Sequence, residues 1–130
     1  MKNLIILILL TYSSLGLALD CENASSTPDI NACGKIELDK IELELNQVYN
    51  RVLKMMDEIS KAPSNIADKS KLKKSFVDAQ RLWVKFREAD CGTTYTLWSD
   101  GTIRGSMYLS CMMDRANKRI KELKDYEERP

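Results

Sequence analysis

Four polar residues next to a cysteine are the part of this sequence best suited to chemistry or recognition. They are Gln80, Arg81, Arg87 and Asp90, which precede Cys91 in one predicted helix. Gln80 and Arg87 are seven residues apart, so they lie on the same flank of that helix. Guanidinium and carboxylate groups form ion pairs or bind a partner. We expect either a structural network, in which Arg87 pairs with Asp90 or with a carboxylate of a neighbouring helix, or a recognition face.

Catalytic chemistry is poorly represented in the chain. The sequence contains no histidine, no Gly-x-Ser-x-Gly elbow and no glycine-rich phosphate loop. Its carboxylates occupy solvent-facing helical positions between lysines, which is typical of a solvated surface. The sequence therefore predicts a protein that is not an enzyme, with no catalytic residue and no cofactor.

The four cysteines, Cys21, Cys33, Cys91 and Cys111, indicate two disulfides. An even number of cysteines in a small exported chain is typical of a disulfide framework. A metal site is disfavoured because histidine and Cys-x-x-Cys pairs are both absent. Pairing Cys21 with Cys33 and Cys91 with Cys111 closes two short loops and is favoured. Joining Cys33 to Cys91 or Cys111 remains an alternative, because an antiparallel bundle brings all three to one end.

The amino-terminal residues 1–18 resemble a secretory signal peptide. Lys2 is followed by an apolar run over residues 4–10, and Gly16-Leu17-Ala18 provides small residues for cleavage. An uncleaved anchor is the competing interpretation. We expect a mature domain of residues 19–130, periplasmic or secreted, without a transmembrane segment. Cleavage removes one of the 20 basic residues, so 19 basic residues balance 19 acidic ones in the mature domain. A nucleic-acid-binding protein would need an excess of positive charge, so nothing favours that function.

Three amphipathic segments predict the architecture. Apolar residues recur at gaps of three and four over residues 33–60, 69–90 and 106–126. The three stripes are Leu38, Ile41, Leu45, Val48, Val52, Met55 and Ile59; Leu72, Phe76, Ala79, Trp83 and Phe86; and Leu109, Met113 with Met112, Ala116, Ile120 and Leu123. The first could instead form an intermolecular coiled coil, but the other two can bury it within the chain. The predicted fold is all-α, a small antiparallel bundle of three main helices cross-linked by two disulfides.

The segments between these helices are predicted to be irregular. Residues 19–32 are polar and rich in turn formers, so we expect an arm held by a disulfide. Gly92 is expected to end the second helix and Ser106 to cap the third. The loop over residues 92–105 has an aromatic tip, where Trp98 either packs on the bundle or contacts a partner.

A longer pattern links these features to a known family. It consists of Cys21 and Cys33, Leu45-Asn46-x-x-Tyr49, Ala79-Gln80-Arg81-x-Trp83-x-x-Phe86-Arg87-x-x-Asp90-Cys91, Gly105-Ser106, Cys111, and Arg119 with Leu123. This pattern resembles the LprI-type domain, a small exported bacterial domain, over nearly the whole mature chain. The resemblance implies a helical, disulfide-linked envelope protein and, for at least part of the family, inhibition of lysozyme. We assign Asn46, Tyr49, Trp83, Phe86, Asp90 and Gly105 to a structural motif.

The resemblance leads to a functional expectation. We expect an exported binding module that resembles lysozyme inhibitors and acts by occluding an enzyme cleft. The candidate binding face combines Gln80, Arg81 and Arg87 with Trp98. The alternative is a structural or assembly protein of the envelope that binds another protein through a helical face. Because the mature domain is neutral, electrostatic attraction to a cationic enzyme would have to be local.

Overall fold

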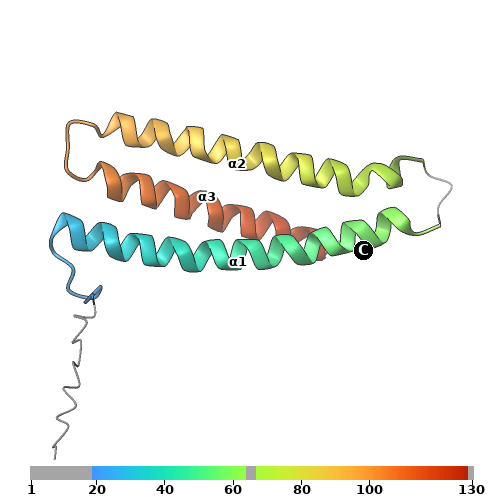
Figure 1. The fold of residues 1–130 in the computed structure, drawn as a ribbon, viewed down its shortest axis with the longest axis horizontal. Helices are drawn as coiled ribbons and strands as arrows, with labels where there is room; N and C mark the ends of the chain where they lie inside the picture. Colours follow the sequence, from blue (N-terminus) through green and yellow to red (C-terminus); the bar gives the residue numbers. More distant parts are fainter. Residues whose placement is uncertain (1–18, 64–66, 129–130) are drawn as a thin grey trace, which may run out of the picture.

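The computed structural model describes residues 19–63 and 67–128, and it confirms the predicted all-α bundle. Three long helices pack along their lengths, α1 (Thr27–Lys61), α2 (Leu72–Leu97) and α3 (Arg104–Glu127). A short 3-10 helix, η1 (Ala67–Lys71), precedes α2. Helices α1 and α3 run in one direction and α2 runs in the other (Figure 1). The predicted signal peptide, residues 1–18, lies outside the described residues.

Helix α1 begins earlier than its apolar stripe predicts. The expected arm over residues 19–32 is wrong in its second part, because the helix starts at Thr27. Ser26 is the N-cap, and its side chain accepts a hydrogen bond from the backbone N–H of Asp29 at 3.2 Å. Pro28 suits the first turn, where a missing N–H costs nothing. Local capping chemistry therefore extends the helix beyond its core-facing residues.

Helix α2 continues through Gly92, where it was predicted to stop, and ends at Leu97. No described glycine has a positive φ, so Gly92 does not form the left-handed turn that usually ends a helix. A glycine inside a helix costs about 1 kcal/mol, which tertiary packing can override. The loop between α2 and α3 is consequently shorter than expected and covers residues 98–103 only.

Helix α3 starts at Arg104, so Ser106 is inside the helix and is not its cap. Its hydroxyl instead donates a hydrogen bond to Asn31 Oδ1 on α1, at 2.7 Å. A predicted local contact is thus replaced by a contact between two helices.

The core divides into a larger and a smaller cluster. The buried members of the larger cluster are Leu45, Val48, Val52, Met56, Phe76, Ala116, Ile120 and Leu123. Those of the smaller cluster are Leu38, Cys91 and Met112. The stripe predicted for α2 is wrong at Ala79, which is exposed, and at Phe86, whose surface is 54% exposed, whereas the neighbouring Arg87 is buried. Helix α2 is thus turned so that Arg87 faces the other helices.

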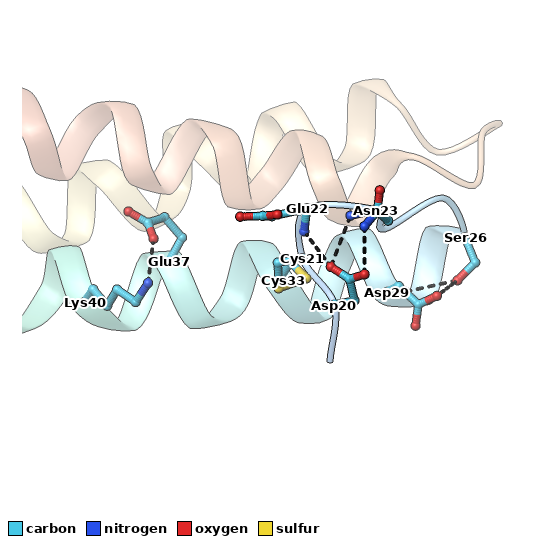
Figure 2. The surroundings of a disulfide bond; sticks show 9 residues. All are labelled: Asp20, Cys21, Glu22, Asn23, Ser26, Asp29, Cys33, Glu37 and Lys40. Carbon is cyan, nitrogen blue, oxygen red and sulfur yellow. Dashed lines mark hydrogen bonds and ion pairs between the residues drawn. A yellow bond between two sulfur atoms is a disulfide. The ribbon is translucent and has the colours of Figure 1, made fainter. Parts of the chain in front are cut away.

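Two disulfides join Cys21 to Cys33 and Cys91 to Cys111, which confirms the favoured pairing. The first fastens the amino-terminal arm to α1 (Figure 2). The second links the last turns of α2 to the first turns of α3. Loops of these lengths correspond to about 3 kcal/mol of stabilisation each in the chain-entropy model. The second disulfide also fixes the base of the loop that carries Trp98.

Candidate functional site

Arg87 is directed into the bundle and pairs with α1. Its Nη1 donates a hydrogen bond to Glu42 Oε1 at 2.6 Å, and only 8% of its side chain is exposed. The guanidinium also lies over the ring of Trp83, with 4.9 Å between its carbon and the ring centroid. A carboxylate and an aromatic face together offset the cost of burying this charge. Of the two expected partners for Arg87, the carboxylate on the neighbouring helix is therefore the one used.

Asp90 serves a different arginine. Its Oδ2 accepts a hydrogen bond from Nε of Arg115 on α3 at 2.8 Å, and Arg115 Nη2 lies 2.8 Å from the same oxygen. The Arg115 guanidinium lies 5.7 Å from the centroid of the Phe86 ring, which explains how that partly exposed aromatic is held. The contact joins α2 to α3 one turn from the Arg87 pair.

Gln80 belongs to a third contact between helices. Its side-chain oxygen accepts a hydrogen bond from Arg119 Nε at 2.9 Å, and Arg119 Nη1 lies 2.8 Å from Glu122. The Arg119 guanidinium is also 5.8 Å from the Trp83 ring centroid, so the indole has an arginine from α2 and one from α3 beside it. Trp83 therefore connects the Arg87 and Arg119 contacts.

The four residues of the candidate face do not form one surface. Gln80 and Arg87 are occupied by contacts between helices, whereas Arg81 and Trp98 are exposed. Arg81 lies near Asp78, at 3.7 Å, about 25 Å along the helix axis from Trp98 at 1.5 Å per residue. Trp98 follows the last residue of α2 and is partly exposed at the tip of the bundle. Only these two side chains are available to a partner.

Packing contacts explain two of the remaining motif residues, Tyr49 and Gly105, but not Asn46. Tyr49 stacks on Phe76 with 5.4 Å between ring centroids, beside the larger core cluster. A Cβ at Gly105 would lie 2.9 Å from Asn31 Nδ2, so only glycine fits there without a shift. Asn46 is exposed on α1, and nothing in the structure explains its place in the pattern.

One group of side chains has the composition of a metal site but not its chemistry. The Asp90 carboxylate lies within 4.8 Å of the sulfurs of Cys91 and Cys111. Both sulfurs belong to a disulfide, whereas metals bind thiolates, and Arg115 already occupies the carboxylate. The group is better explained as part of the link between α2 and α3.

Two hollows lie on the surface of the described residues. One, of about 270 Å³, is lined by Gly92, Tyr95 and Tyr108. The two tyrosines meet edge to face at 6.2 Å, and Arg104 lies over Tyr95 at 4.9 Å. The other, of about 260 Å³, lies between α1, α2 and α3 beside Phe76 and Arg119. The first is lined by a glycine and two aromatic rings and suits a partner's side chain, whereas the second also has the polar side chains of Ser75 and Arg119.

Sequence reasoning missed several partners of these residues. No sequence pattern indicated three of these partners, Glu42, Arg115 and Asn31. Each makes its contact with another helix, and such a contact depends on the register between the two helices. Arg119 was part of the family pattern, but its contact with Gln80 was not predicted. An inventory of polar residues bordering each stripe would have indicated Glu42, which lies between Leu38 and Leu45.

The described part of the chain is therefore a small helical domain with two disulfides, in which Arg87, Arg115 and Arg119 join the helices. None of its described helices is long and apolar enough to cross a membrane. The family model of lysozyme inhibitor LprI matches residues 20–123, so the chain belongs to the LprI family.

An uncharacterized protein of Rhizobium meliloti (strain 1021) is also similar to this chain. It is 27% identical over 110 residues, which cover 84% of this chain and 79% of the relative. No solved structure matches the chain.

Proposed function

We propose that this chain is an exported inhibitor that binds a lysozyme and blocks its substrate cleft without chemistry of its own. The observation that carries the proposal is the match to the lysozyme inhibitor family over residues 20–123. Two disulfides support folding outside the cytoplasm, in the periplasm or after secretion, because disulfides persist in oxidising compartments.

The shape of the bundle tip supports occlusion as the mode of action. Leu97 and Trp98 project where α2 ends, and the Cys91–Cys111 disulfide joins the two helices that carry this loop. Such a preorganised, convex loop can enter a concave site and lose little conformational entropy on binding. Of the four residues of the candidate face, Trp98 is thus the proposed contact, while Gln80 and Arg87 hold the helices that position it.

A lysozyme turnover assay tests the proposal. Bacterial cell walls serve as the substrate, and purified mature protein is added to reactions that each contain one lysozyme. The lysozymes tested include a strongly basic animal enzyme. We expect inhibition that saturates near one inhibitor per enzyme for at least one lysozyme. Unchanged turnover at a large molar excess against every type would contradict the proposal.

A second candidate is an envelope structural or assembly protein that binds through a helical face. It is favoured by Leu82 and Phe86, two exposed apolar residues one turn apart on α2. Pull-down from periplasmic extract, with the Leu82→Ser variant as comparison, separates the two candidates. A partner other than lysozyme that is lost with this variant would favour the assembly role.

A further inference from the structure

Charge is distributed unevenly along the bundle. We define the loop end as residues 19–41 and 88–114, which comprise the arm, the first part of α1, and the loop with its flanking turns. This end has nine carboxylates and three cationic side chains. The remaining described residues have ten carboxylates and fifteen cationic side chains. The carboxylates of the loop end are Asp20, Glu22, Asp29, Glu37, Asp39, Glu88, Asp90, Asp100 and Asp114, and its cations are Lys35, Lys40 and Arg104.

Ion pairs within the described residues leave much of this negative charge unbalanced. Lys35 pairs with Asp39 and Lys40 with Glu37, while Asp90 and Asp114 pair with cations from outside the loop end. The other five carboxylates have no ion-pair partner among the described residues; they are Asp20, Glu22, Asp29, Glu88 and Asp100. Asp20 and Asp29 bond only to uncharged groups (Figure 2). The loop end is therefore a region of negative potential.

The same end carries most of the large exposed apolar side chains. Leu97 is 80% exposed, more than any other large hydrophobic residue that the structure describes. The others of the loop end are Leu19, Ile30, Ile36, Tyr95, Trp98 and Ile103. Asn31, which follows Ile30, accepts a hydrogen bond from Ser106 near the start of α3, so the start of α1 lies close to the residues that follow the loop. Exposed apolar side chains grouped in this way are typical of interaction sites.

We propose that the loop end docks onto a basic protein surface, with Leu97 and Trp98 entering its cleft and the unpaired carboxylates facing its cations. This inference rests on the proposed lysozyme inhibition. It specifies that the loop end is the inhibiting surface and that strongly basic lysozymes are its targets. Charge complementarity selects the occupant, because the unpaired carboxylates attract a basic protein and repel an anionic lipid surface. The hollow between Tyr95 and Tyr108 can receive an apolar side chain of the partner.

Two variants of the loop end test the docking surface. Asp100→Lys reverses an exposed charge, and Leu97→Ser removes an apolar side chain that is 80% exposed. We expect each to raise the inhibition constant for a strongly basic animal lysozyme about 10-fold, the scale of an interface hot spot. Raising the ionic strength from about 50 to 300 mM should increase the inhibition constant of the wild-type protein more than that of Asp100→Lys, because salt screens the negative charge that the variant has lost.

Matched controls have the same substitutions on exposed residues outside the loop end. They are Asp68→Lys in η1 and Leu43→Ser on α1, which we expect to change the inhibition constant less than twofold. Circular dichroism confirms that all four variants are folded. If the controls weaken inhibition as much as the loop-end variants, or if Asp100→Lys and Leu97→Ser inhibit normally, the docking surface is wrong while the proposed function stands. If wild-type protein inhibits no lysozyme, both are overturned.

Discussion

The pair between Arg87 and Glu42 provides the most direct test of how this bundle is held together. Replacing Glu42 with alanine leaves the Arg87 guanidinium buried beside Trp83 without its carboxylate. Losing one partner of a fully buried pair costs about 3–5 kcal/mol, because the remaining charge is uncompensated. The Glu42 side chain is 29% exposed, so water can reach part of the site. We therefore expect Glu42→Ala to lower the free energy of unfolding by about 2–3 kcal/mol.

Glu44 offers a matched control on the same helix. It pairs with Lys124 at 2.7 Å, but its side chain is 50% exposed. Exposed ion pairs contribute about 0–1 kcal/mol, so Glu44→Ala should change the free energy of unfolding by no more than that. Urea unfolding followed by circular dichroism, with the disulfides intact, measures both variants. A difference of about 2 kcal/mol shifts the midpoint by roughly 1 M urea for a small domain.

A double variant separates an unpaired charge from simple loss of packing. Replacing both partners, Glu42→Leu with Arg87→Met, removes the charge together with its carboxylate. Apolar replacements of buried ion pairs are often neutral or stabilising, so the double variant should be more stable than Glu42→Ala. The reasoning fails if Glu42→Ala is as stable as Glu44→Ala, or if the double variant is less stable than Glu42→Ala.

Three further predictions concern a close contact, a cross-link and a surface charge. Gly105→Ala should lower the free energy of unfolding by about 1–2 kcal/mol, because the new Cβ would lie 2.9 Å from an α1 side chain. Gly92→Ala is the control: its new Cβ meets nothing within 4 Å, so it should raise the free energy of unfolding by about 0.5–1 kcal/mol in the same urea titration. Replacing Cys91 and Cys111 together by alanine should cost about 3 kcal/mol, measured against the wild-type unfolding curve, and an unchanged curve would contradict the chain-entropy estimate. Hydrogen bonds from two lysines hold the pKa of Asp57 below its ordinary value of 3.8, so it stabilises the fold above that pH and less as the pH falls through the lowered pKa. Asp57→Asn should therefore be less stable than wild type at pH 7, with a difference that disappears in acid; a constant difference would contradict this.

The sequence predicted the helices well where burial decided the pattern. In the α1 stripe, Leu38, Leu45, Val48 and Val52 are buried as expected and Ile41 is partly buried, because most of the other positions are polar and leave one possible face. The pairing of the cysteines followed from loop length alone. Both results depend on short-range spacing, which the sequence displays directly.

The phase of α2 could not be predicted in the same way. Phe86 and Arg87 are adjacent, and hydrophobicity alone places the phenylalanine inside. The bundle instead buries Arg87, because Glu42 on α1 compensates its charge, and leaves Phe86 against Arg115 at the surface. The identity of that carboxylate depends on the register between two helices, which no local pattern encodes.

Gly92 illustrates the other kind of failure. Its intrinsic preference favours a helix end, yet α2 continues for more than one turn beyond it. The helix continues past Gly92 with the disulfide at the preceding residue and with the hydroxyls of Thr93 and Thr96 donating hydrogen bonds to carbonyls four residues earlier. The extension matters for function, because it carries Leu97 and Trp98 outward to the tip.

The small net charge of the chain, +1, hides the feature on which the proposed docking depends. Two segments far apart in the sequence, residues 19–41 and 88–114, both have an excess of carboxylates, which the cationic side chains of the other residues cancel. The antiparallel fold brings the two acidic segments to the same end, as the contact between Asn31 and Ser106 shows. A partner that approaches this end meets a local field rather than the average, so a neutral domain can still attract a cationic enzyme.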